Sequence, residues 1–411
     1  MATWRLGTRS GGQGRHRPGV EALWRRCRAA GDFYLHSYEG AYCPGCEQFY
    51  TPGELIDGRC PEHDTPPEPV SERNWFFRLS RYAQRIEHVI ESGQVRIVPA
   101  ARRNEVLAFV RAGLLDFSVS RPAERSGGWG IPVPDDPEQV IYVWWDALTN
   151  YVTALGYGSD DAPYRRWWVG SNERTHVIGK GILRFHAVYW LGLLLSAGLP
   201  LPTTICVHDY LSLAGAKISK SSRNNVSPKD LVTHYGADAV RWWLVRDVAR
   251  IGETDFTIAR LVDTADRDLA NGLGNLISRT LRLAHQHGAE PAAALLGCDL
   301  LPPRIDAALD DFDFRAATST ICEAVADANR YIEAQRPWHL AHTDPPRSRA
   351  VVGTLIHTCR VIASELTPFL PSGARRCLTQ LDSGDRPTPV FPRLAKDPRP
   401  ATAQTQPPQP G

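Results

Sequence analysis

Long apolar runs are missing from this chain, and net charge and cysteine are both low for its 411 residues. The longest apolar candidate, from Ala187 to Leu201, is too short for a membrane span and is interrupted by glycines, so we expect no membrane segment. The start is rich in Arg and Gly without an apolar stretch, so we expect no secretory signal. A net charge of +2 means that nucleic-acid binding must rely on local basic patches. Nine cysteines, three of them with metal spacing, exclude a disulfide scaffold and favour a reducing cytoplasm.

The length predicts two to four domains, and shifts in composition mark their boundaries. Residues 1–19 have almost no apolar content and are predicted to be a disordered basic N-terminus. An amphipathic pattern starts at Val20 and opens a connective region, 20–138, in which residues 72–116 are predicted to be helical. The segments that follow are an α/β segment at 139–207, a lysine-loop region at 208–260, a helical domain at 261–384 and a disordered Pro-rich tail at 385–411.

Strands and helices alternate in residues 139–207. Short apolar runs at 141–145, 175–178 and 204–207 are typical of strands buried on both faces. Helical stretches at 145–156 and 182–197 lie between them. This alternation predicts a parallel sheet of the α/β class.

From Ser227 to about residue 380 the pattern is helical throughout. Ser227 is a good N-cap, Pro228 fits a first helical turn and Asp230 lies near the positive helix end. The chain is therefore predicted to combine an α/β part with an all-α part.

Two pairs of metal-ligand residues lie thirteen residues apart. Cys43 and Cys46 form the first pair, and Cys60 and His63 form the second. Two short pairs of this kind are the spacing of tetrahedral zinc, and Gly45 supplies turn chemistry between the first two ligands. Three thiolates and one imidazole leave no position for water, so we expect one structural Zn²⁺. The alternative is four unrelated residues in a loop.

A lysine-rich loop precedes the Ser227 cap. It contains Lys217, Ser219, Lys220 and Ser221, and two lysines in a mobile loop can grip a polyphosphate. Their charge would stabilise a pyrophosphate leaving group more in the transition state than in the ground state. The spacing alone is equally compatible with a solvated, charged surface loop.

Several segments together resemble class I aminoacyl-tRNA synthetases, and among them the methionyl family. Residues 217–221 resemble its Lys-Met-Ser-Lys-Ser loop, 142–148 the strand whose first Trp lines the methionine pocket, and 176–180 its His-x-Ile-Gly-Lys segment. The further matches are residues 184–190, 120–122, 129–132, 275–279 and 336–338. The resemblance covers about residues 20–384 and implies a partial Rossmann-like sheet, a zinc-knuckle connective region and an all-α anticodon-binding domain.

The resemblance implies roles for named residues. It assigns catalysis to Lys217, Lys220, Arg121 and Lys180, and ATP binding to Lys217, Ser219, Lys220, Ser221 and Gly179. It assigns the methionine pocket to Trp144, His186 and Trp190, and the reading of the CAU anticodon to Asn275, Arg279 and Trp338. It also implies Mg²⁺ with ATP, and methionine and tRNA-Met as substrates.

Each assigned residue also has a structural interpretation. Trp144 and Trp190 are compatible with core aromatics, and His186 with a buried polar group. Asn275 and Arg279, four residues apart, are compatible with an exposed helix face. Trp338 is compatible with an anchor at a helix start.

The chain departs from the family in two places. No segment resembles the Gly-rich strand and turn that lead to His-Ile-Gly-His in the family, so half of the doubly wound sheet is expected to be missing and an edge exposed. A partner chain that supplies this half is one expectation. Gly181 stands where the family has an Asp that holds the adenylate ribose. The hypotheses are a methionine–tRNA ligase, an impaired paralogue or truncated gene product that binds tRNA without activating methionine, and a specialised ligase that feeds another pathway.

Overall fold

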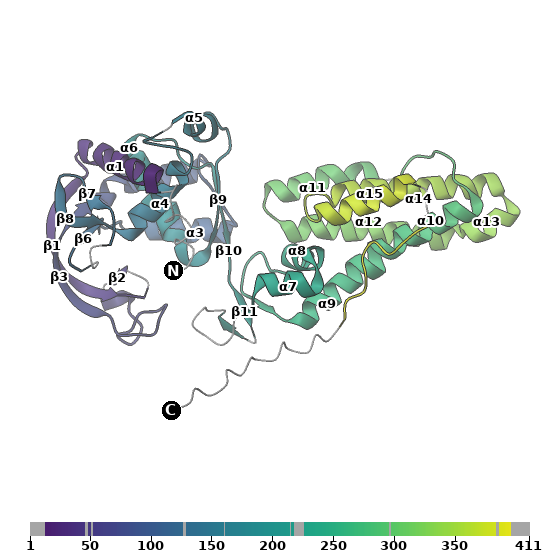
Figure 1. The fold of residues 1–411 in the computed structure, drawn as a ribbon, viewed down its shortest axis with the longest axis horizontal. Coiled ribbons are helices and arrows are strands. Elements are labelled where there is room, and N and C mark those ends of the chain that lie inside the picture. The colour runs from purple at the N-terminus through teal and green to yellow at the C-terminus, as the bar shows by residue number, and fades with distance from the viewer. Residues whose placement is uncertain are drawn as a thin grey trace, which may run out of the picture. The chain divides into compact units, whose positions relative to one another are not determined.

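The structure is a computed structural model that divides into two compact units, Met1–His208 and Asp209–Gly411. It describes residues 13–45, 48–50, 52–125, 129–159, 161–213, 215–217, 226–295, 297–383 and 386–395 (Figure 1). Each unit has its own hydrophobic core. None of the helices in these ranges has the length and apolar content to cross a membrane.

An antiparallel sheet of the N-terminal unit carries the predicted metal ligand Cys43 at the end of its longest strand. Its strand order is β2-β1-β3-β5, and the strands are β1 (Phe33–Cys43), β2 (Gln48–Tyr50), β3 (Glu68–Phe77) and β5 (Phe117–Ser118). β1 and β3 pair over ten residues, from Phe33 opposite Phe77 to Tyr42 opposite Glu68. The knuckle segment therefore extends from the end of a long two-stranded ribbon.

The helical prediction for residues 72–116 is wrong at its start. β3 buries Val70, Glu72, Asn74 and Phe76 in alternation, the two-residue period of a strand. The segment becomes helical only at a 3₁₀ turn, η3 (Leu79–Tyr82), followed by α2 (Ala83–Glu91) and α3 (Ala100–Arg111). Pairing with the distant strand β1 overrides the local spacing that suggested a helix.

A three-stranded parallel sheet has the order β4-β10-β9. The strands predicted at 175–178 and 204–207 are confirmed as β9 (Thr175–Gly179) and β10 (Thr204–His208). The third strand, β4 (Arg96–Val98), comes from the connective region, so residues 20–138 and 139–207 share one sheet and one core. β9 has a described neighbour on one side only, and Val177 on it is 65% exposed.

The apolar run at 141–145 is a strand end and a helix start rather than one buried strand. β8 (Asp136–Ile141) ends at Ile141 and belongs to an antiparallel sheet, β6-β8-β7, with β6 (Ser120–Pro122) and β7 (Pro132–Val133). α4 (Val143–Thr153) begins two residues later. Trp144 therefore lies on a helix, which corrects the strand that the resemblance implied.

Helices pack around the sheets of the N-terminal unit. α1 (Gln13–Ala29) packs against α4 and α6. It starts inside residues 1–19, which are predicted to be disordered, so that prediction is wrong for residues 13–19. Burial of Val20, Leu23 and Trp24 explains why this helix is ordered. The others are α5 (Asp161–Tyr164), a π-helical turn η4 (Arg165–Val169), a 3₁₀ turn η5 (Lys180–Ile182), a π-helical turn η6 (Phe185–Tyr189) and α6 (Trp190–Ala197). A 3₁₀ turn η2 (Pro52–Glu54) lies in the knuckle.

The C-terminal unit begins with a small sheet and continues as helices (Figure 1). The sheet has the order β12-β11-β13, with β11 (Leu211–Leu213), β12 (Ala216–Lys217) and β13 (Thr254–Phe256). β13 interrupts the region predicted to be helical throughout, because it pairs with β11. The Ser227 cap is confirmed, since its side chain accepts a hydrogen bond from the Asp230 amide at 3.3 Å.

The helices of the C-terminal unit surround one core. They are α7 (Pro228–Tyr235), α8 (Ala237–Arg246), α9 (Ile258–Ala265), the π-helical segment η7 (Asp266–Gly274), α10 (Asn275–His287), a 3₁₀ turn η8 (Cys298–Leu300), α11 (Leu301–Asp310), α12 (Phe314–Gln335), α13 (Pro337–Thr343), α14 (Pro345–Glu365) and α15 (Pro371–Ser383). The core extends from Tyr235 to Phe391, so it joins the lysine-loop region to the helical domain.

Part of the predicted Pro-rich tail is ordered. Val390 and Phe391 are 2% and 7% exposed and belong to the core of the C-terminal unit. The amide of Leu394 donates a hydrogen bond to Asp266 at 2.9 Å. The prediction of disorder is therefore wrong for residues 386–395, because two apolar side chains in a polar segment suffice to anchor it.

Candidate functional site

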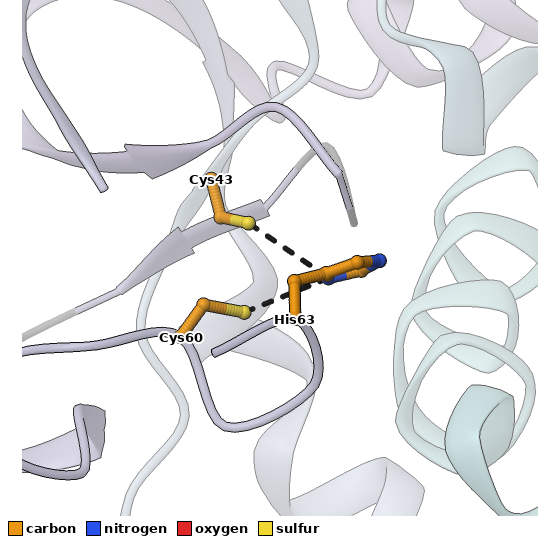
Figure 2. Close-up of side chains that lie close together, drawn as sticks. All are labelled: Cys43, Cys60 and His63. Atoms are coloured by element: carbon orange, nitrogen blue, oxygen red, sulfur yellow. Dashed lines mark hydrogen bonds between the residues drawn. The ribbon is translucent and has the colours of Figure 1, made fainter. Parts of the chain in front are cut away.

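Three of the four predicted metal ligands converge at the end of the β1–β3 ribbon. The ligand atoms of Cys43, Cys60 and His63 all lie within 4.8 Å of one another, and Figure 2 shows both thiols next to the imidazole. His63 Nδ1 lies 3.9 Å from Cys43 Sγ and 3.7 Å from Cys60 Sγ. Cys46 lies outside the described residues.

The distances fit a tetrahedral zinc ion. Zinc bonds of about 2.3 Å to sulfur and 2.0–2.1 Å to nitrogen place the two ligand atoms roughly 3.6 Å apart at a tetrahedral angle. Gly45 leaves room for the ligand, because a Cβ there would lie 2.7 Å from His63 Cδ2. The donor set therefore suits zinc, and the Gly in the Cys-Pro-Gly-Cys turn has a steric reason.

The knuckle has little core of its own. The cluster at the ligands consists of Cys43, Tyr50 and Cys60, with Leu55 packed against it. Burial raises the pKa of the Cys60 thiol, but hydrogen bonds from Tyr50, His63 and the backbone at Glu62 outweigh burial and lower it overall. This environment favours the thiolate, which is the form that binds metal.

An aromatic cluster contains two buried histidines of the N-terminal unit. His176 on β9 and His186 on η6 are 4% and 3% exposed, and Trp190 at the start of α6 is fully buried. The Tyr151 ring on α4 lies 4.0 Å from His176 and 5.6 Å from His186, measured between ring centroids. We call Tyr151, His176, His186 and Trp190 the aromatic cluster.

Hydrogen bonds define the protonation of both histidines. The carbonyl of Ile182 can only accept, so His186 donates through Nδ1 at 2.9 Å and accepts from the Tyr151 hydroxyl through Nε2 at 2.8 Å. His176 Nε2 accepts from the Trp190 indole at 3.2 Å. Burial lowers the pKa of both histidines, that of His176 to about 3. The aromatic cluster therefore contains hydrogen-bonded polar groups but no charge.

Trp144 lies outside this hydrogen-bonded set. It is half-buried near the start of α4 and stacks on Phe185 with ring centroids 3.8 Å apart. Because Phe185 precedes His186 on η6, this stack joins α4 to the turn that carries the histidine. Tyr151 was missed by the sequence analysis, although its position seven residues after Trp144 places both on one face of α4.

Arg121 on β6 is largely buried, with 12% of its side chain exposed. Its guanidinium lies over the rings of Tyr42 and Tyr142, at 4.4 and 4.7 Å from the centroids. Its NH1 lies 3.9 Å from the carboxylate of Glu72, which also pairs with Arg125 at 2.7 Å. The structure thus holds this cation between three elements of the N-terminal unit.

The predicted phosphate-binding residues are only partly described. Gly179 ends β9 and Lys180 begins η5, and both are half-buried. Gly181 is exposed directly after them. The backbone of Lys217 lies in β12, whereas Ser219, Lys220 and Ser221 lie outside the described residues.

The predicted anticodon residues lie on two helices that contact each other. Asn275 and Arg279 are on α10, and Trp338 is the second residue of α13, which packs against α10. Asn275 is exposed and Trp338 is 41% exposed. Arg279 forms an ion pair with Glu333 of α12 at 2.6 Å. An exposed aromatic ring beside polar groups on packed helices can stack on an unpaired base.

Two family descriptions match the chain. The description "tRNA synthetases class I (M)" matches residues 9–66 and 50–281. The description "Anticodon binding domain of methionyl tRNA ligase" matches residues 300–397.

Relatives of known name cover most of the chain. The methionine–tRNA ligase of Caldanaerobacter subterraneus subsp. tengcongensis is 39% identical over 380 residues, which is 89% of this chain and 59% of that protein. The methionine–tRNA ligase of Streptomyces coelicolor is 36% identical over 388 residues, 89% of this chain and 71% of that protein. The chain thus spans less than two thirds of the first of these relatives.

The fold matches a solved structure from Mycobacterium tuberculosis. It is methionyl-tRNA synthetase bound by methionyl-adenylate, with a TM-score of 0.83 and 34% identity. The match covers 92% of this chain and 81% of that one.

Proposed function

This chain belongs to the methionyl family of class I aminoacyl-tRNA synthetases, and from that premise we propose that it acts as a methionine–tRNA ligase. The carboxylate of methionine attacks the α-phosphate of ATP, which gives methionyl-adenylate and pyrophosphate. The 3′-terminal hydroxyl of tRNA-Met then takes the acyl group and AMP leaves. The observation that carries the proposal is the buried, uncharged aromatic cluster, whose rings suit contact with the thioether side chain of methionine.

The methionine pocket is assigned to Trp144, His186 and Trp190, with Tyr151 as an additional member. A neutral His186 held between Ile182 and Tyr151 avoids the cost of burying a charge beside an apolar side chain. The test is methionine-dependent ATP–pyrophosphate exchange with wild type and Tyr151→Phe. Loss of the hydroxyl should raise KM for methionine more than it lowers kcat. Absence of exchange in the wild type, with its tRNA binding intact, would reject the ligase proposal.

The triphosphate of ATP, bound with Mg²⁺, is assigned to basic groups and backbone. Lys217, Lys220, Arg121 and Lys180 are the catalytic set, and Gly179, Ser219 and Ser221 complete the ATP site. Lysines stabilise the pyrophosphate as its charge develops. Lys220→Ala should therefore lower kcat of exchange with little change in methionine binding, and a change confined to methionine binding would contradict the assignment.

A structural zinc ion is assigned to Cys43, Cys46, Cys60 and His63. A closed Cys3His set holds shape and leaves no coordination position for substrate. Metal analysis of the purified chain should give one zinc, and Cys60→Ser should lose it. That variant should also expose residues 38–70 to protease and weaken charging indirectly. A knuckle that stays protected without metal, with unchanged activity, would contradict this. Cysteines that bind metal and form no disulfides fit a reducing compartment such as the cytoplasm.

Binding of the CAU anticodon of tRNA-Met is assigned to Asn275, Arg279 and Trp338. The exposed ring of Trp338 supplies a stacking surface, and the amide and guanidinium supply donors for base edges. Binding of a CAU stem-loop RNA to the whole chain tests this assignment without requiring catalysis. No preference for CAU over other loops would reject it.

A second function is favoured by Gly181 and by β9, which has a strand neighbour on one side only among the described residues. A glycine offers no carboxylate to a ribose hydroxyl, and loss of such a contact costs roughly 1.5–3 kcal/mol. The chain would then bind tRNA without activating methionine. Gly181→Asp separates the two functions, because it should raise exchange in an impaired enzyme. CAU binding without exchange in either form supports the second function.

A further strand is the proposed neighbour of β9. This strand lies at the edge of the parallel sheet with Thr175 and Val177 exposed, although parallel sheets are normally buried on both faces. We assign the neighbour to a partner chain that carries the Gly-rich part of the family's nucleotide-binding domain. Co-expression with that part of a relative should raise exchange activity, and co-purification without any gain would argue against this partner.

A further inference from the structure

Arg336 joins α12 to α13 in an unusual backbone conformation. Its φ and ψ are 47° and 59°, in the left-handed region that L side chains rarely adopt. The following Pro337 restricts it further, because a residue before proline prefers extended backbone. Glycine would occupy this helix end at lower energy. The backbone alone therefore does not explain an arginine here, and such outliers gather at functional sites.

The Arg336 side chain is exposed and uncompensated. Several other arginines of the helical region are paired, as in Arg279 with Glu333, Arg349 with Glu290 and Arg360 with Asp382. Within the described residues the Arg336 guanidinium makes no hydrogen bond or ion pair. Its carbonyl is occupied instead, since it accepts from the amide of His339 at 2.8 Å. The backbone is thus fixed while the charge stays available.

The position of Arg336 links it to the proposed anticodon surface. Trp338, 41% exposed, lies two residues later at the start of α13. Glu333, which holds Arg279 of α10, lies three residues earlier at the end of α12. Arg336 therefore lies in the chain between the stacking ring and the ion pair that ties the two helices together.

We propose that Arg336 binds a phosphate of the anticodon loop and positions the loop backbone over Trp338. This inference rests on the proposed tRNA function. A guanidinium without an intramolecular partner presents its full donor fork to phosphate oxygens. Phosphate contacts fix register and orientation, and they carry no information about base sequence. Arg336 therefore contributes affinity for RNA, and the bases are read by other residues.

A matched pair of variants of the full chain tests this role. Arg336→Gln removes the charge, and Arg315→Gln removes an equally exposed and unpaired charge near the other end of α12, about 30 Å away. Binding of a CAU stem-loop RNA is measured over a range of salt concentrations. Arg336→Gln should bind roughly three- to tenfold more weakly at low salt, and its slope of log K against log salt should fall by about 0.7–0.9. Arg315→Gln should bind as wild type.

Two further measurements separate this role from a structural one. The loss for Arg336→Gln should be the same for a CAU loop and for a loop with another anticodon, because a phosphate carries no sequence. Arg336→Gly should bind RNA as weakly as Arg336→Gln while its thermal midpoint stays equal to or above that of wild type, because glycine relieves the left-handed backbone.

The outcomes discriminate between failures. Unchanged affinity and salt slope in Arg336→Gln, or a loss equal to that of Arg315→Gln, would overturn the phosphate role while the tRNA function stands. A loss confined to the CAU loop would also overturn it, because it would indicate a base contact. If the wild-type chain binds none of the stem-loops, the proposed tRNA function fails and this inference fails with it.

Discussion

His176 is buried among the rings of the aromatic cluster, where its Nε2 accepts a hydrogen bond from Trp190. Burial, with a smaller effect from the neighbouring His186, lowers the pKa of His176 from 6.5 to about 3. The folded unit therefore keeps this imidazole neutral, whereas the unfolded chain binds a proton as the pH falls below 6.5. The stability that depends on a neutral His176 is complete above pH 6.5 and is lost as the pH falls towards 3.

The loss is large enough to measure at mild pH. At about pH 5 the unfolded imidazole is almost fully protonated and the folded one is not, so linkage gives a loss of about 2 kcal/mol relative to about pH 7.5. Exposure of only 4% means that solvent does little to screen the effect. The lowered pKa of His186 acts in the same direction. The free energy of unfolding of a protein domain is about 5–15 kcal/mol, so a loss of this size should make the N-terminal unit clearly less stable in weak acid.

His176→Gln isolates this effect. A glutamine oxygen can still accept the hydrogen bond from the Trp190 indole but does not titrate in this range. Loss of the ring contact with Tyr151 makes the variant less stable at every pH, so only the change with pH is compared. Urea unfolding of the N-terminal unit is monitored by pulse proteolysis at about pH 7.5 and about pH 5. The difference between the two free energies of unfolding gives that change.

The wild type should lose about 2 kcal/mol more than His176→Gln between these two pH values. His36→Gln is the matched control, because it makes the same substitution at an exposed position of β1. Equal pH dependence in wild type and His176→Gln would refute the reasoning. It would mean that the imidazole of His176 can become charged within the folded aromatic cluster.

Three other changes test separate contacts. Gly45→Ala should lower zinc affinity in a competition with a chelator, because its Cβ would lie 2.7 Å from the His63 ring, and unchanged affinity would show that the turn relaxes freely. Ser227→Ala should cost the C-terminal unit about 1 kcal/mol in urea unfolding through loss of the α7 cap, whereas Ser227→Asp should retain most of it. Trp338→Ala should weaken CAU stem-loop binding by about 1–3 kcal/mol, and equal binding would exclude a stacking role.

Local signals in the sequence were sufficient for several elements. The strands β9 and β10 are short apolar runs between helical stretches, and both were predicted close to their observed bounds. The cap at Ser227 is a contact within one turn, so a short segment contains all the information. The predicted metal-ligand spacing is local in the same sense, since each predicted pair of ligands lies within four consecutive residues.

Elements that depend on distant pairing were not predictable in this way. In the segment from Trp75 to Ile86 a four-residue spacing of large side chains suggested a helix, but the first part pairs with β1 more than thirty residues upstream. The apolar run at 141–145 has no marker for the change from strand to helix after Ile141. The ordered segment at 386–395 depends on a core formed by helices far away in the chain.

The contacts of the site show the same division. The sequence indicates most residues of the aromatic cluster, but it does not indicate the partner of His186. Tyr151 comes from α4, and its hydroxyl reaches the imidazole only in the folded chain. The ring of Trp144 was expected in a strand and lies on a helix. Spacing identifies a residue for a site, whereas only the packed fold identifies the group that orients it.

Arg121 connects the proposed metal site to the segment that precedes α4 within the N-terminal unit. Its guanidinium lies over the ring of Tyr42, the neighbour of the predicted ligand Cys43 on β1. It also lies over the ring of Tyr142, the residue that precedes α4. Disorder at the knuckle would remove the Tyr42 ring from this cation and leave Tyr142 and Glu72 among its remaining contacts. Loss of the proposed structural metal is therefore expected to loosen the segment that precedes α4, and with it the position of Trp144.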